Sequence, residues 1–176
     1  EAISLVENTK ILLVSEISCA GKDTIKNQLL KDTEYRDIVS HTTRPIRSNN
    51  GNDEIDGVDY SFISLDKAEE MLIDRQFIEA KFVHGKVYGT SISQIKQAHD
   101  NDQISITDID IEGISEYKKL SDKVVAVFIL PPDYKTWRAR FANRYSSADE
   151  FEAEFNKRLP EAIRALEKAL SRPYYH

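Results

Sequence analysis

Residues 10–30 constrain the fold more than any other segment of the chain. They begin with a short apolar run, residues 11–14, which is typical of a strand buried inside a parallel sheet. A loop of small residues follows as far as Gly21, and from Asp23 onward apolar residues recur at helical spacing. A strand, a tight loop ending in Gly-Lys and a helix form the layout of a phosphate-binding loop, in which backbone N–H groups at a helix start surround an anion.

This loop departs from the usual phosphate-loop pattern at two positions. The pattern has a glycine, four further residues and then Gly-Lys-Ser/Thr. Gly21 and Lys22 match it, whereas Glu16 stands at the first glycine position and Asp23 replaces the hydroxyl residue. An ordinary strand–turn–helix junction with a lysine at its mouth is the alternative interpretation of the same residues.

Length and composition exclude several classes of protein. The chain has 176 residues, which suits one domain with room for a subdomain, and 40% of them are hydrophobic, enough for a core. The net charge of −6 argues against a general nucleic-acid binder, and no apolar run approaches the roughly 20 residues that a membrane span needs. The single cysteine excludes an internal disulfide, and residues 1–10 lack a signal-peptide pattern, so we expect a cytoplasmic protein.

Apolar strand-like runs alternate with helical segments in the rest of the chain. Residues 104–109 and 124–130 are predicted to be two further core strands, and residues 32–37 a polar link. The alternation predicts a three-layer α/β fold with a parallel central sheet. Residues 40–90 break the alternation with short strand-like pieces, which indicates a small, mainly β insertion. Within it, Asp66 is expected to cap a short helix.

The insertion begins with the basic segment SHTTRPIR, residues 40–47. Pro45 favours an extended backbone here, so the guanidinium groups of Arg44 and Arg47 could converge on one phosphate. Tyr60 could add a hydroxyl donor. A solvated basic turn is the alternative interpretation.

Glu79 lies between apolar residues on a predicted strand, where an unpaired charge is costly. Guanine offers two N–H donors that one carboxylate can accept, whereas adenine presents an acceptor at N1. A buried carboxylate therefore favours guanine over adenine. A surface glutamate on an edge strand is the alternative.

Two further charged groups lie toward the C-terminal half. Asp108 and Asp110 are two residues apart on a predicted strand, so their carboxylates would face the same side about 6.5 Å apart. At the carboxyl end of a parallel strand they would meet a ligand, with magnesium or a base amino group as a suitable partner; a plain acidic strand end is the alternative. The second group could neutralise a polyphosphate or pair with nearby acidic residues, and consists of Arg138, Arg140, Arg144 and Arg158.

The order of these blocks along the chain resembles that of the guanylate kinase family. The blocks are the Gly21-Lys22 loop, SHTTRPIR, DGVDYSF, FIEAKFVHGKVYGTS, DIDIEG and FILPP, followed by arginine-rich helices, and the resemblance covers residues 11–175. It implies a P-loop kinase fold and phosphoryl transfer from ATP to GMP with Mg²⁺. It implies no nucleic-acid or membrane partner and leaves the oligomeric state open.

The resemblance also assigns roles to individual positions. It implies that the GMP phosphate is held by Arg44, Arg47, Tyr60 and Tyr88. It implies that guanine is recognised by Ser40, Glu79, Thr90 and Asp110. ATP would be bound by Ser18, Cys19, Ala20, Gly21, Lys22, Asp23 and Thr24, with magnesium at Asp23 and Asp108. Catalysis would depend on Lys22, Arg44, Arg140, Arg144 and Arg158.

By the same resemblance the chain divides into three parts. Residues 1–39, 91–132 and 151–176 would form the P-loop core, residues 40–90 the GMP-binding subdomain and residues 133–150 the lid. Members of the family continue beyond this point into a final strand and helix.

Two other functions stay open from the sequence alone. A non-catalytic guanylate-kinase-like module that recognises a phosphorylated ligand in the GMP site would explain Glu16 and Asp23. Such a module has no need of Lys22, Asp108 or the lid arginines. A kinase for another nucleoside monophosphate is disfavoured if Glu79 faces the base.

Overall fold

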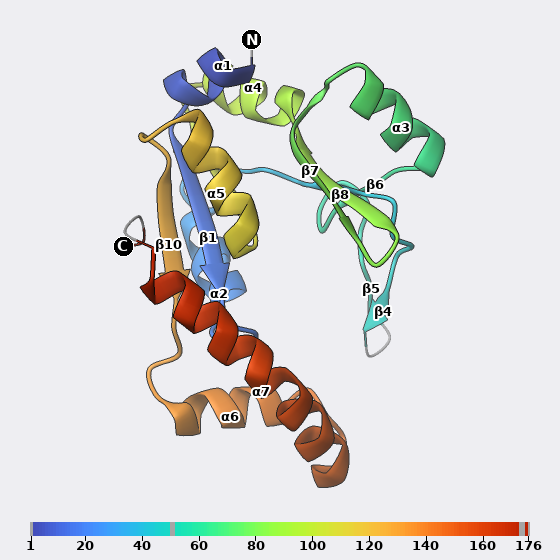
Figure 1. Cartoon of the computed structure of the whole chain (residues 1–176), viewed down its shortest axis with the longest axis vertical. Helices are drawn as coiled ribbons and strands as arrows, with labels where there is room; N and C mark the ends of the chain where they lie inside the picture. Colours follow the sequence, from blue (N-terminus) through green and yellow to red (C-terminus); the bar gives the residue numbers. More distant parts are fainter. Residues whose placement is uncertain (1, 50–51, 173–174, 176) are drawn as a thin grey trace.

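A parallel sheet lies at the centre of the chain. The computed structural model describes residues 2–49, 52–172 and 175, and within them four parallel strands have the order β10-β1-β9-β2 (Figure 1). The prediction of three core strands is confirmed, whereas the polar link expected at residues 32–37 is wrong because part of it is the edge strand β2. The strands are β1 (Ile11–Glu16), β2 (Tyr35–Asp37), β9 (Ile104–Asp108) and β10 (Val125–Ile129).

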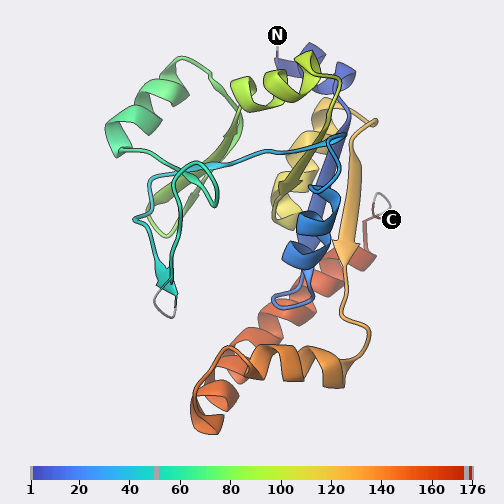
Figure 2. The same ribbon diagram turned by 180° about the vertical axis from the view of Figure 1, so that it is seen from behind.

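Helices cover both faces of this sheet, as the alternation of elements predicts. Figures 1 and 2 show α5 (Ile111–Leu120) on one face and α2 (Lys22–Leu29) on the other. Successive side chains of β1 point to opposite faces, so Leu13 packs in a core with Ile114 of α5, while Val14 packs in a second core. The helices α1 (Ala2–Asn8) and α4 (Ile92–Asp100) pack together at the amino ends of the strands.

The insertion forms a second sheet beside the first. Its strand order is β6-β3-β8-β7, and β7 and β8 form a long antiparallel hairpin (Figure 1). Its helix α3 (Leu65–Ile73) begins after Ser64, whose Oγ accepts from the N–H of Lys67, so the expectation that Asp66 caps it is wrong. The other elements are β3 (His41–Thr42), β4 (Ser48–Asn49), β5 (Asn52–Asp53), β6 (Ser61–Phe62), β7 (Phe77–Val83) and β8 (Lys86–Ser91).

A helical hairpin extends past the carboxyl ends of the parallel strands. It consists of α6 (Tyr134–Ala142) and α7 (Ala148–Leu170), and Figure 2 shows it below the sheet. Buried aromatic side chains join the two helices, among them Trp137 and Phe155, whose ring centroids are 5.1 Å apart. The indole N–H of Trp137 donates to the carbonyl of Ser18 at 2.6 Å, so the hairpin is docked on the loop that follows β1. No helix among the described residues is both long and apolar enough to cross a membrane.

Candidate active site

One cavity lies between the parallel sheet and the insertion. Its volume is about 330 Å³, and its lining combines the end of β1 and the start of α2 with strands β7 and β8. Glu16 and Lys81, which have no binding role in the sequence-based assignment, line it as well. Seven of the predicted site residues line this one cavity: Lys22, Ser40, Tyr60, Glu79, Tyr88, Asp108 and Asp110.

The loop after β1 surrounds an anion that belongs to the chain itself. One carboxylate oxygen of Glu16, Oε2, accepts from the backbone N–H groups of Gly21 and Lys22, both at 2.8 Å. These N–H groups open helix α2 and have no acceptor within that helix. The anion-binding cradle predicted from the sequence is therefore formed, and the Glu16 carboxylate occupies it.

The cradle depends on two residues with a left-handed backbone. Gly21 has φ of 117°, which glycine adopts at little cost. Cys19 has φ of 68°, a conformation that costs a residue with a Cβ roughly 1–2 kcal/mol, and its side chain is buried. The turn is thus maintained against local strain, and it aims successive N–H groups at one point.

Beside the cradle, partly buried lysine and aspartate side chains form a network with the exposed Asp23. The ammonium of Lys22 lies 2.6 Å from Asp23 Oδ1 and 3.0 Å from Asp108 Oδ2, and the ammonium of Lys26 lies 2.8 Å from Asp108 Oδ1 and 2.8 Å from Asp37 Oδ1. Burial alone would raise the pKa of Asp108, but the two ammonium groups outweigh it and lower that pKa to about 2. Sequence reasoning missed Lys26, although its i+4 spacing from Lys22 places both lysines on one side of the helix.

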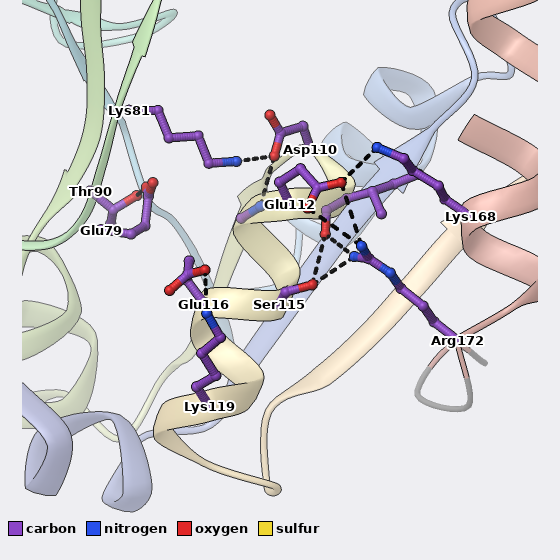
Figure 3. Close-up of polar contacts among 12 residues, drawn as sticks. Glu79, Lys81, Thr90, Asp110, Glu112, Ser115, Glu116, Lys119, Lys168 and Arg172 are labelled. Atoms are coloured by element: carbon purple, nitrogen blue, oxygen red, sulfur yellow. Dashed lines mark hydrogen bonds and ion pairs between the residues drawn. The ribbon is translucent and has the colours of Figure 1, made fainter. Parts of the chain in front are cut away.

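Asp110 occupies a different element from the one predicted. Strand β9 ends at Asp108, and Asp110 is the N-cap of α5, where its Oδ1 accepts from the N–H of Gly113 at 2.7 Å. The expectation that both aspartates lie on one strand face is therefore wrong. The strand ends at Asp108, and two residues later Asp110 already caps the next helix. Lys81 crosses from β7 to form an ion pair with Asp110, and this contact joins the insertion to the core (Figure 3).

Glu79 lies on β7 opposite Thr90 of β8. Its Oε1 accepts from the hydroxyl of Thr90 at 3.0 Å, and both side chains are shown in Figure 3. Burial raises the pKa of Glu79, and the Thr90 hydrogen bond opposes the rise without cancelling it. A partly buried carboxylate with one hydroxyl partner retains capacity to accept further N–H donors.

Arg44 is held by a carboxylate that sequence reasoning missed. Its Nη1 and Nη2 donate to the two oxygens of Glu54 at 2.7 and 2.8 Å, and the backbone N–H of Arg47 donates to the same carboxylate at 2.8 Å. The guanidinium of Arg44 lies 5.2 Å from the ring centroid of Tyr60, which itself lies 6.0 Å from the ring of Tyr88. Three of the four residues predicted to hold a phosphate, Arg44, Tyr60 and Tyr88, thus lie together, and Glu54 ties the backbone of Arg47 to Arg44.

The three predicted lid arginines have different surroundings. Arg140 donates from Nη1 to the carbonyl of Ala20, so it reaches the loop. Arg144 is exposed, and Arg158 lies 3.8 Å from Glu154 on its own helix. Within the described residues, only Arg140 of the three therefore has a hydrogen bond to the loop between β1 and α2.

Two carboxylates of the site are within reach of a single cation. Asp23 and Asp108 both contact the ammonium of Lys22. In the part of the chain that the structure describes, no group of three or more His, Cys, Asp or Glu side chains is arranged to hold a metal ion. Carboxylate oxygens are nevertheless suited to Mg²⁺, which takes one or two of them and completes its shell with water and phosphate.

The fold and the cavity together define a class of protein. A parallel sheet whose first strand leads through a Gly-Lys loop into a helix, with a β insertion and a helical hairpin beside it, is that of a P-loop nucleoside monophosphate kinase. The sequence model of the guanylate kinase family matches residues 8–171. The chain belongs to the guanylate kinase family.

Relatives of known sequence or structure agree with this membership. The chain is 33% identical to a guanylate kinase of Clostridioides difficile (strain 630), over 97% of its own length and 80% of that protein. It is 34% identical to guanylate kinase 1 of Oryza sativa subsp. japonica over 94% of its own length, and it spans 42% of that longer protein. The crystal structure of guanylate kinase from Anaplasma phagocytophilum aligns with a TM-score of 0.67 at 23% identity, covering 98% of this chain and 78% of the other, which confirms the fold.

The Arg44–Glu54 pair gives a prediction about stability. Glu54→Gln should lower the free energy of unfolding by about 2 kcal/mol, because Arg44 keeps its charge where its own side chain is only 8% exposed. Hydrogen bonding to Arg44 also holds the pKa of Glu54 below its ordinary value. The stabilisation is therefore present at neutral pH and is lost as the pH falls through the folded-state pKa.

Urea denaturation of the two proteins at pH 7 measures this loss. The exposed pair of Lys67 and Glu70 provides the control, since Glu70→Gln should change the free energy of unfolding by less than about 0.5 kcal/mol. Equal losses in the two variants would contradict a structural role for Glu54.

Proposed function

We propose that this chain transfers the γ-phosphoryl group of ATP to GMP and so forms ADP and GDP. The observation that carries the proposal is the single cavity in which Lys22 and Asp108 of the parallel-sheet part face Tyr60, Tyr88 and Glu79 of the insertion. Family membership supports it, since the matched relatives are named guanylate kinases. Its partners are the small molecules ATP and GMP, and the acidic chain with one cysteine supports a cytoplasmic location.

The base of GMP would be recognised in the part of the cavity formed by β7, β8 and the start of α5. Glu79 offers carboxylate oxygens to the two N–H donors of guanine and is positioned by Thr90. Ser40 and Asp110 line the same cavity. Adenine would offer the Glu79 carboxylate no pair of N–H donors and would leave it with Thr90 alone, which accounts for selectivity against AMP.

The phosphate of GMP would bind where Arg44, Tyr60 and Tyr88 converge, with Arg47 at the edge. Arg44 retains N–H groups beyond those that Glu54 uses, and the tyrosine hydroxyls add donors. Glu54 fixes the plane of the guanidinium, so little side-chain freedom is lost on binding.

The donor phosphates would bind the loop formed by residues 18–24, with Lys22 as the point charge and Arg140 beside the loop. Asp23 and Asp108 would hold Mg²⁺, whose chemistry here is to neutralise charge on the phosphate oxygens. The acceptor is already an anionic oxygen, so the site needs no general base. What these residues supply is alignment of the two phosphates and compensation of their charge.

We retain the division into a core, a GMP-binding part at residues 40–90 and a lid at residues 133–150 as part of this proposal. The two sheets meet at the cavity, and the helical hairpin contacts the loop after β1 through Trp137 and Arg140, which supports the division. Movement of the outer parts toward the core would exclude water, which otherwise competes as phosphoryl acceptor. The lid roles of Arg144 and Arg158 depend on such a movement, because neither lines the cavity within the described residues.

A coupled assay of ADP formation tests the proposed reaction directly. With ATP and Mg²⁺, GMP should be phosphorylated with a kcat/KM far above that for AMP, CMP or UMP. Turnover with another monophosphate in preference would reassign the substrate. Absence of turnover with intact GMP binding would identify a binding module instead.

Lys22→Ala should lower kcat about 10²–10³-fold, because a cation aimed at the transferred group is removed. GMP affinity should change by less than about threefold, since Lys26 still pairs with Asp108 and the insertion is intact. Steady-state kinetics and calorimetry with GMP separate the two effects. Lys31→Ala, an exposed lysine after α2, is the matched control, and a large loss of GMP affinity in Lys22→Ala would contradict its assignment to the donor side.

Glu79→Gln should reduce the discrimination between GMP and AMP about tenfold or more, because the neutral amide no longer rejects adenine so strongly. In the unaltered protein this discrimination should weaken as the pH falls through the folded-state pKa of Glu79, which burial raises above the ordinary value of 4.5. The ratio of the GMP and AMP affinities measures this at each pH, because both ligands carry the same phosphate. Glu69→Gln, on the exposed side of α3, is the control, and unchanged selectivity in Glu79→Gln would remove Glu79 from the base site.

A further inference from the structure

We propose that Glu16 is an internal competitor for the phosphate groups of the donor nucleotide. Its carboxylate occupies the cradle that those groups would bind, so the donor binds only when the Glu16 side chain leaves. The identity of the donor rests on the proposed function. The competition itself rests on the geometry of the loop.

The contacts of Glu16 are those that a bound phosphate oxygen would make. A single oxygen, Oε2, accepts at 2.8 Å from both Gly21 N and Lys22 N, at the positive end of α2. Hydrogen bonds from backbone N–H groups to a charged oxygen are among the stronger ones in proteins. One set of donors cannot serve two anions, so a phosphate at this point and the Glu16 carboxylate exclude each other.

The lysine of the loop is also paired with carboxylates of the protein. The ammonium of Lys22 contacts Asp23 and Asp108, and these aspartates outweigh the effect of burial and raise the pKa of Lys22. Both features that make a phosphate-binding loop, the N–H cradle and the lysine, are therefore satisfied by carboxylates of the protein. The loop is closed to a polyphosphate by its own side chains.

The side chain of Glu16 can leave without disturbing the sheet. Glu16 is the last residue of β1, and its backbone is paired in register with Ile129 of β10. The side chain lines the 330 Å³ cavity and also a second cavity of about 310 Å³ beside α7. Rotation of the side chain alone therefore frees the cradle.

Removal of the Glu16 carboxylate should strengthen donor binding and lower the stability of the nucleotide-free protein. The apparent affinity for a donor equals the intrinsic affinity multiplied by the fraction of molecules with a free cradle. If Glu16 occupies the cradle in about 90–99% of molecules, its removal tightens donor binding about 10- to 100-fold. The same carboxylate caps α2, so its removal should lower the melting temperature of the nucleotide-free protein by about 2–4 °C.

The experiment measures the binding of pyrophosphate, ATP and adenosine by calorimetry to the unaltered chain, Glu16→Gln and Glu16→Ala. Pyrophosphate and ATP should bind about 10- to 100-fold more tightly to both variants, while adenosine, which has no phosphate, should bind equally to all three. Thermal unfolding without nucleotide should show the loss of about 2–4 °C, the loss of one helix cap. Glu16→Gln keeps the shape of the side chain, so it supplies the measurement if Glu16→Ala folds poorly.

Glu161→Gln is the matched control, because it removes one negative charge from an exposed position on the lining of the second cavity. Equal pyrophosphate affinities in the unaltered chain and both Glu16 variants would overturn the proposal. An equal gain in Glu161→Gln would also overturn it, since the effect would then be one of general charge. A gain in binding without any GDP formation would instead leave the competition standing and remove the proposed kinase reaction.

Discussion

Hydrogen-bond donors and cations that converge in a folded protein need anions, whether or not a ligand is bound. This constraint shapes the whole cavity. The start of α2 presents N–H groups without helical partners, and Glu16 accepts from them. Arg44 is buried in the insertion, and Glu54 neutralises it with both oxygens. In each case the chain places one of its carboxylates where a phosphate would be expected to interact.

The two carboxylates differ in what they do to a ligand site. Glu54 accepts from two nitrogens of Arg44 and the carbonyl of Pro45 accepts from one of them as well, so these contacts use three of the five N–H groups of the guanidinium and orient it without using all of them. Glu16 uses the two N–H groups that form the centre of the cradle. Under the proposed function, the carboxylate on the GMP side orients a cation, whereas the carboxylate on the ATP side occupies the anion site itself. Both glutamates carry the same charge. Their effects differ because the guanidinium of Arg44 has more N–H groups than Glu54 uses, whereas Glu16 uses both N–H groups at the centre of the cradle.

Local patterns are sufficient to predict the main elements, and together with the family resemblance they identify seven of the residues that line the cavity. The buried strands have continuous apolar runs, and the segments around Arg44 and Glu79 have distinctive sequences, so their positions follow from the sequence alone. The roles of Lys81 and Glu54 do not, because they depend on contacts with residues 29 and 10 positions away that no periodicity encodes. The error at Asp110 has a local cause: an aspartate two residues after a strand residue continues the strand or caps a helix, and tertiary packing decides which. Glu16 departs visibly from the loop pattern, but its hydrogen-bond partners depend on the folded shape of the loop.

Lys26 would allow Lys22 to turn from Asp108 toward a phosphate without a large electrostatic cost. If Lys22 turned from Asp108 toward a phosphate and no other lysine were near, the partly buried carboxylate of Asp108 would be left without a cation, which is unfavourable. Lys26 lies 2.8 Å from the other oxygen of Asp108 and is itself held by Asp37. Asp108 would therefore stay paired with Lys26 if Lys22 turned away. The charge network beside the cradle thus has a second cation, so turning Lys22 toward a phosphate would not leave Asp108 without a partner.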